Sequence, residues 1–114
     1  MRWTITHEIE GYYDAVAPTL EEAENAVFEE DFGDLYDIDW YETDHFTDKD
    51  GNINASFHVQ GYMDVDVTAD SLEEAIELSQ DVINEAYFGE LYDIYSEFHS
   101  YERMEPEPDM ERDD

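Results

Sequence analysis

The chain has 114 residues, a length that suits one domain with a single hydrophobic core. Its 34 Asp and Glu residues face four Lys and Arg residues, which gives a formal charge of -30, while 41% hydrophobic and 15% aromatic residues are enough to build a core. The absence of cysteine excludes disulfides, thiolate metal sites and a cysteine nucleophile, and the negative charge opposes direct binding to nucleic acid or to an anionic membrane.

The first third of the chain predicts a strand, a helix and a second strand. Residues 3–17 alternate between apolar and polar side chains, which is typical of a strand. Thr19 and Glu22 then form a capping box, which marks the start of a helix. We expect this helix to end at Gly33, because glycine readily adopts the left-handed conformation of a helix C-cap. Alternation returns over residues 35–42 and predicts the second strand.

The turn at residues 47–52 is rich in Asp, Asn and Gly, and it superficially resembles a calcium-binding loop. Placing Gly51 at the sixth position of such a loop puts Phe46 at the first position and Phe57 at the last. Both positions require oxygen ligands, so the sequence does not predict an EF-hand here.

The second half of the chain repeats the same plan. Residues 55–67 alternate, Ser71 and Glu74 form a second capping box, and the helix that follows is expected to end at Gly89. Residues 91–102 alternate again and predict the last strand.

Three sequence landmarks occur twice in the same order, which indicates an internal duplication. They are a Gly-Tyr pair, a Leu-Glu-Glu-Ala segment and a Phe-Gly-acidic-Leu-Tyr-Asp-Ile segment. They begin at Gly11, Leu20 and Phe32 in the first copy, and at Gly61, Leu72 and Phe88 in the second. The interval between copies lengthens along the unit, as small insertions in a diverged second copy would cause.

The duplicated β-α-β plan predicts an α+β fold of the ferredoxin-like class, with a four-stranded antiparallel sheet and two helices on one face. The first and third strands are expected to be central. Residues 1–103 would form a single domain of two repeats, at about 3–44 and 55–102, and residues 104–114 a disordered acidic tail. The pattern leaves open a second arrangement, a homodimer in which each unit completes its sheet with another chain.

The sequence contains no phosphate-binding loop, dinucleotide fingerprint or nucleophile motif. Its histidines, His7, His45, His58 and His99, lack the spacing of metal ligands. We therefore predict no catalytic residue, no metal site and no cofactor, and we do not expect an enzyme.

The sheet face left open by the helices is the predicted partner-binding surface, because alternation places acids and tyrosines there together. Carboxylates two residues apart on a strand lie about 6.6 Å apart, which is comparable with the intervals between charges along a DNA strand. The alternative is a solvated sheet made acidic by general composition. The predicted residues are Glu8, Glu10, Tyr12, Asp14, Asp37, Asp39, Tyr41, Tyr62, Asp64, Asp66, Asp93, Tyr95, Glu97 and Tyr101.

In its small size, its scarcity of Lys and Arg and its carboxylate rows, the chain resembles phage and mobile-element DNA mimics that inhibit restriction enzymes or CRISPR effectors. The resemblance implies an anti-restriction or anti-CRISPR inhibitor that acts in the host cytoplasm. Its partner would be a basic nucleic-acid-binding protein, such as a nuclease or CRISPR effector, whose Lys and Arg residues accept carboxylates in place of phosphates. Tyrosines would provide anchor contacts.

Two other interpretations fit the charge. The chain could be an acidic domain adapted to high salt in a halophile, without any mimicry. It could also be a protein that binds calcium or another cation through its surface carboxylates.

Overall fold

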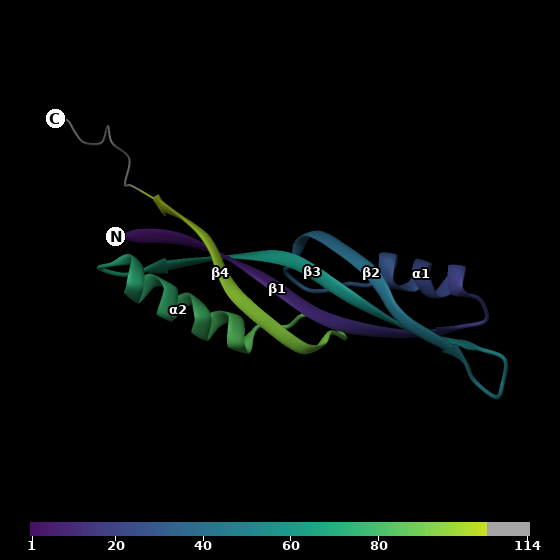
Figure 1. Cartoon of the computed structure of the whole chain (residues 1–114). Helices are drawn as coiled ribbons and strands as arrows, with labels where there is room; N and C mark the ends of the chain where they lie inside the picture. The colour runs from purple at the N-terminus through teal and green to yellow at the C-terminus, as the bar shows by residue number, and fades with distance from the viewer. Residues whose placement is uncertain (105–114) are drawn as a thin grey trace. The chain divides into compact units, whose positions relative to one another are not determined.

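The structure is a computed structural model and describes residues 1–104. Figure 1 shows its elements in chain order, which are β1 (Arg2–Ala17), α1 (Leu20–Glu29), β2 (Tyr36–Thr47), β3 (Ile53–Thr68), α2 (Leu72–Glu85) and β4 (Tyr92–Met104). The strands form an antiparallel sheet in the order β2-β3-β1-β4, so the predicted α+β class and the central positions of the first and third strands are confirmed. The tail predicted at 104–114 lies, apart from Met104, outside the described residues.

The two central strands owe their length to a sustained alternation of side chains. In β1 the odd-numbered residues are buried, among them Ile5 and Ile9, except for the partly buried Tyr13, while the even-numbered residues are partly or fully exposed. In β3 Phe57 and Val59 are likewise fully buried and their even-numbered neighbours are less so. One face of each central strand therefore carries the core, and the other carries the polar residues that the sequence predicts there.

Both helices begin at the predicted capping residues. The Thr19 hydroxyl accepts a hydrogen bond from the Glu22 N–H at 3.2 Å, and the Ser71 hydroxyl accepts one from the Glu74 N–H at 3.1 Å. Each bond satisfies an N–H that has no partner within the first helical turn. The acidic residues of these first turns also lie at the positive end of the helix dipole, so their negative charges stabilise the start of each helix.

The predicted helix ends are wrong. The residue after α1 is Glu30, which is already extended with φ -72°, and the residue after α2 is Ala86, extended with φ -76°. Gly33 and Gly89 do adopt positive φ, at 73° and 67°, but each lies beyond its helix. These glycines therefore serve the loops that follow the helices and do not cap them.

The described residues fall into two compact units, each of which combines parts of both repeats. The first unit contains Met1–His7, Asp64–Ala86 and the described residues from Glu97 onward. The second unit contains Glu8–Met63 and Tyr87–Ser96.

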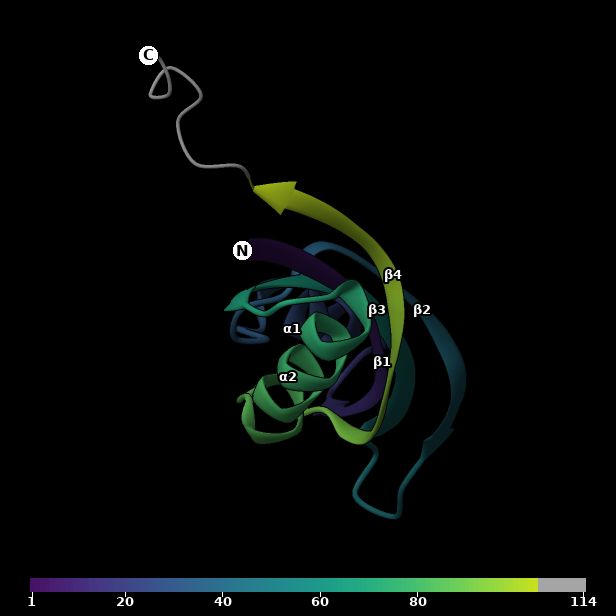
Figure 2. The ribbon, with the colours of Figure 1, turned by 90° about the vertical axis from the view of Figure 1, so that its left-hand side faces the viewer.

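In the first unit, α2 packs on the odd-numbered side of β1, and Figure 2 shows this helix beside β1. Trp3 and Ile5 cluster with Ala75 of the helix, and the Trp3 indole N–H donates to the carbonyl of Ala69 at 3.1 Å. This hydrogen bond gives the buried indole the partner that its polar atom needs.

His7 is fully buried in the same unit. The Ser79 hydroxyl donates to the Ile76 carbonyl at 2.8 Å, so it accepts from His7 Nε2–H, 2.7 Å away. The other ring nitrogen, Nδ1, has no hydrogen-bond partner among the described residues. Burial lowers the pKa of His7 and favours its neutral form.

In the second unit, the segment after α1 packs on the odd-numbered side of β1. The Tyr13 hydroxyl donates to Glu30 at 3.1 Å, and the Tyr13 ring meets the Phe32 ring edge-on at a centroid distance of 5.7 Å. Burial, and then the bond to Glu30, raises the pKa of Tyr13. The start of the recurring Phe-Gly segment is thus fixed against the central strand.

The two recurring Phe-Gly segments also approach each other closely in the second unit. A Cβ atom on Gly33 would lie 2.0 Å from the carbonyl oxygen of Tyr87, and a Cβ atom on Gly89 would lie 2.2 Å from the carbonyl oxygen of Asp31. The contact is reciprocal, since each glycine meets the residue two positions before the other. Only glycine fits at both positions.

Candidate functional site: an aromatic band on the open sheet face

The register of β2 against β3 decides which side chains share the open face. Residues opposite each other in an antiparallel pair point to the same side, and the pairs include Tyr41 with His58 and Tyr36 with Tyr62. The register shifts after Tyr36, where Asp37 has a positive φ of 52°. Strict alternation placed Tyr36 on the side opposite Tyr41, and this irregularity brings both to one face.

β4 departs from strict alternation as well. Asp93 has the same positive φ of 52° as Asp37, and the ring of the preceding Tyr92 lies 6.0 Å from the ring of Tyr12 on the open face. Strict alternation over residues 91–102 predicts Tyr92 on the apolar side, opposite Asp93 and Tyr95. Conversely, Tyr101 was predicted on the open face, but its ring lies 5.9 Å from that of the buried Trp3, on the helix-covered side.

The open face of the second unit carries a continuous row of rings, one from each strand, which we name the aromatic band. Its members follow the strand order and are Tyr41, His58, Tyr12 and Tyr92. Successive ring centroids lie 5.0, 5.4 and 6.0 Å apart. These separations are those of interacting aromatic rings, so each ring of the band supports its neighbour from one strand to the next.

A further pair of rings, Tyr36 and Tyr62, lies on the same face of the second unit. Tyr36 and Tyr62 have centroids 6.0 Å apart and planes inclined at 40°, and Tyr12 and Tyr92 have centroids at the same separation with planes inclined at 37°. The pairs occupy equivalent places in the two repeats, because Tyr12 and Tyr62 both follow the repeated glycine. The duplication has therefore preserved this contact.

Carboxylates adjoin the band and are hydrogen-bonded within it. Glu10 lies 3.0 Å from Nε2 of His58. Asp14 Oδ1 accepts two hydrogen bonds, from the Ser56 hydroxyl at 2.8 Å and from the Tyr92 hydroxyl at 2.9 Å. The bond to Asp14 raises the pKa of the Tyr92 phenol, because a phenolate beside the carboxylate would lose the bond and be repelled.

Two further predicted acids are held by hydroxyls in the first unit. The Thr6 hydroxyl donates to Asp64 at 2.7 Å, and the Thr4 hydroxyl donates to Asp66 at 2.7 Å. The Arg2 guanidinium also lies 3.8 Å from Asp66 in an exposed ion pair. In each case a short β-branched donor on β1 fixes a carboxylate on the neighbouring β3.

The remaining predicted residues are distributed along the strands. Glu8 lies on the even-numbered side of β1, and Asp39 faces Gln60 across the β2–β3 pair. Asp37 and Asp93 occupy the irregular positions, and Tyr95 and Glu97 lie in β4. Asp64, Asp66, Glu97 and Tyr101 belong to the first unit and the other predicted residues to the second. Of the aromatic band, Tyr12 and Tyr41 were predicted, and the structure adds His58 and Tyr92.

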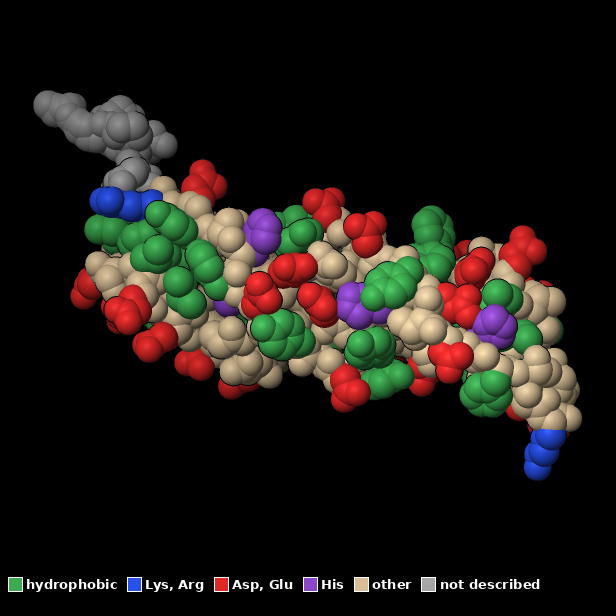
Figure 3. Space-filling view, in the orientation of Figure 1, with side chains coloured by type: hydrophobic (Ala, Val, Ile, Leu, Met, Phe, Trp, Pro, Cys, Tyr) green, Lys and Arg blue, Asp and Glu red, His purple; other side chains and the backbone are tan. Residues whose placement is uncertain are grey.

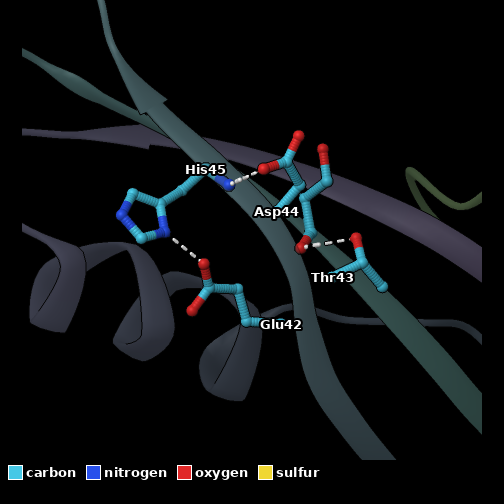
Figure 4. Close-up of polar contacts among 5 residues, drawn as sticks. Glu42, Thr43, Asp44 and His45 are labelled. Atoms are coloured by element: carbon cyan, nitrogen blue, oxygen red, sulfur yellow. Dashed lines mark hydrogen bonds and ion pairs between the residues drawn. The ribbon is translucent and has the colours of Figure 1, made fainter.

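The far end of β2 holds a separate pair, Glu42 and His45, which Figure 4 shows pointing toward each other. The register shifts between Glu42 and Asp44, and this irregularity places two residues three apart in sequence on one side of the strand. The Thr43 hydroxyl donates to the Ser56 carbonyl at 3.1 Å. Across residues 1–104 no three or more His, Asp or Glu residues are grouped so that they could hold a metal ion.

At the turn between β2 and β3, Asp48 organises the hairpin. Its carboxylate accepts from the Asn54 side chain at 2.9 Å and from the N–H groups of Asp50 and Asn52 at 2.9 and 3.1 Å. The bond from Asn54, followed by the backbone bonds, lowers the pKa of Asp48. The carboxylate oxygens of Asp48 therefore bind groups of the turn itself.

The surface view in Figure 3 shows carboxylates interspersed with hydrophobic side chains and histidines. Comparison with protein-family models, curated proteins and solved structures found no match. No helix within residues 1–104 has the length and apolar character needed to cross a membrane.

Proposed function

We propose that the protein is a DNA mimic that occupies the basic nucleic-acid-binding groove of a host defence or DNA-processing enzyme, as an inhibitor of the anti-CRISPR or anti-restriction kind. The observation that carries the proposal is that Asp14, Asp64 and Asp66 each accept a hydrogen bond from a hydroxyl on the neighbouring central strand. An acidic surface that served solubility alone would not need its carboxylates fixed.

The spacing of the fixed carboxylates supports mimicry. Asp64 and Asp66 lie two residues apart on β3, a separation of about 6.6 Å for an extended strand. DNA presents one charge per about 3.4 Å of axis on each strand, along a backbone that winds around this axis. A cationic groove could therefore pair with both carboxylates and release the counterions that it would release to DNA.

The charge balance supports a cationic partner. The formal charge is -30, and residues 104–114 contribute six acids and Arg112 to it, so most of the charge belongs to the rest of the chain. Like charges gathered on a sheet destabilise it, and a cationic partner would compensate for this cost.

We also propose that the β-α-β-β-α-β topology belongs to the ferredoxin-like class, although this assignment does not bear on the choice of partner.

Competition with DNA tests the proposal. The protein is immobilised, exposed to bacterial lysate at low salt, and washed either with duplex DNA or with a salt gradient. We expect nucleic-acid-binding proteins to be captured and then displaced by the duplex. Captured proteins that duplex DNA leaves in place would show that the surface does not compete for a nucleic-acid groove.

A matched pair of variants assigns the effect to the sheet. Asp14→Asn, Asp64→Asn and Asp66→Asn together neutralise the fixed carboxylates while keeping their shape. Glu29→Gln, Glu77→Gln and Asp81→Asn remove the same number of charges from the helices. Capture should weaken in the sheet variant far more than in the helix variant. An equal loss would mean that net charge alone recruits the captured proteins.

A further inference from the structure

The aromatic band offers ring surface to solvent beside carboxylates. Tyr12, Tyr41 and Tyr92 are 36%, 59% and 42% exposed. These three exposed tyrosines, with His58 between Tyr41 and Tyr12, form a platform on which planar groups can stack. A platform of this kind can bind one cation more tightly than another of the same charge.

We propose that the aromatic band is a docking platform for arginine side chains, and that it selects a partner segment rich in arginine over one rich in lysine. This inference rests on the proposed function, because it names the chemistry of the groove that the mimic occupies. The guanidinium group is planar and weakly hydrated, and it stacks on aromatic faces, whereas the lysine ammonium is a compact and strongly hydrated charge.

The neighbouring carboxylates complete the arginine site. Both hydrogen bonds that Asp14 accepts end on Oδ1, so its Oδ2 remains available to a guanidinium N–H. Glu10 lies on the same strand, on the other side of Tyr12 in sequence, and its carboxylate meets His58 within the band. An arginine stacked on Tyr12 would therefore lie close to a carboxylate with which it can form charge-assisted hydrogen bonds.

Charge complementarity argues for this occupant over others. A nucleic acid could stack its bases on the tyrosines, but its phosphates would meet a chain of charge -30. A second copy of the chain would bring the same charge and be repelled. A segment rich in arginine can stack on the rings and pair with the carboxylates at the same time.

Two peptides of equal charge test the selectivity, namely nona-arginine and nona-lysine, each titrated into the full chain by calorimetry at about 0.3 M salt. Each guanidinium stacked on an exposed ring should contribute about a twofold to fivefold gain in affinity. With more than one ring engaged, we expect nona-arginine to bind at least about fivefold more tightly than nona-lysine.

The variant Tyr12→Leu with Tyr41→Leu should reduce this preference to about twofold or less, because it removes two rings and keeps apolar bulk. The matched control, Phe28→Leu with Tyr87→Leu, removes two rings that are 75% and 71% exposed but lie outside the band. The control should keep the preference of the wild type.

The outcomes separate the two proposals. Equal affinity of the wild type for the two peptides would overturn the stacking inference and leave DNA mimicry standing. Equal loss of preference in both double variants would also overturn it, because the band would then have no special role. If neither peptide bound at low salt, the inference would fail together with the proposed function.

Discussion

Gly33 and Gly89 occupy equivalent positions in the two repeats, and each meets the backbone of the segment that contains the other. A Cβ atom added to Gly33 would lie 2.0 Å from the carbonyl oxygen of Tyr87, and one added to Gly89 would lie 2.2 Å from the carbonyl oxygen of Asp31. Both glycines also have positive φ. The contact therefore depends on glycine for two reasons at once, conformation and space.

Gly33→Ala and Gly89→Ala should each lower the free energy of unfolding by about 3 kcal/mol or more, because each adds both left-handed strain and a backbone clash. Gly51→Ala is the control, since Gly51 has a positive φ of 86° but nothing lies within 4 Å of its Cβ position. It should cost about 1–2 kcal/mol. Urea unfolding in 1 M salt measures all three, and equal losses would contradict the clash.

His7 should contribute stability at neutral pH that is lost as the pH drops below about 6.5. Its pKa is lowered by burial, so the unfolded chain takes up the proton first as the pH falls. One such group gives a slope of at most about 1.4 kcal/mol per pH unit. The free energy of unfolding of the wild type should therefore decline more steeply in this range than that of His7→Gln. Parallel curves for the two proteins would refute a role for His7.

The Tyr92 phenol should titrate above the ordinary range for tyrosine, because its hydrogen bond to Asp14 raises its pKa. Ultraviolet titration of the wild type minus Tyr92→Phe isolates this residue, and the same difference in an Asp14→Asn background should lie closer to pH 10. A raised pKa means that the bond contributes to stability below pH 10 and is lost as the pH rises through the pKa. An unchanged midpoint in the Asp14→Asn background would mean that the bond does not hold the proton.

Charge reversal at the helix C-termini should stabilise the protein. Glu29 and Glu85 end α1 and α2 at the negative end of each helix dipole, and neither last turn contains a basic residue. Glu29→Lys and Glu85→Lys should each add about 0.5–1 kcal/mol at low salt. Glu21→Lys and Glu73→Lys make the same change in charge at the helix N-termini and should gain less or lose stability. Thermal unfolding at low and high salt compares the two pairs, and equal gains would mean that net charge alone matters.

The strands and the helix starts could be predicted from sequence because their signals are local. The side-chain period of two identifies β1 and β3, and one hydroxyl followed three residues later by glutamate identifies each helix start. The helix ends could not be predicted in the same way. Gly33 has the conformation of a helix cap, but the need for it comes from Tyr87, more than fifty residues away in sequence.

The aromatic band could be predicted only in part, because a strand irregularity changes which side chains share a face. Tyr12 and Tyr41 were predicted there, whereas Tyr92 was placed on the apolar side and His58 was not included among the site residues. A sequence signal for the irregularity was present in the recurring Tyr-Asp pairs, at Tyr36-Asp37 and Tyr92-Asp93. Aspartate tolerates positive φ, so an acid after the tyrosine in both repeats is compatible with a bulge.

The reciprocal contact of the glycine loops bears on how such a chain could have arisen. A polypeptide of half this length would contain one loop and none to receive it, so it would complete the contact by pairing with an identical copy. Fusion of two genes would then have joined a symmetric dimer into one molecule whose halves were free to diverge. Residues 1–50 expressed alone should accordingly sediment as a dimer or remain unfolded, and a stably folded monomer of this fragment would rule out that ancestry.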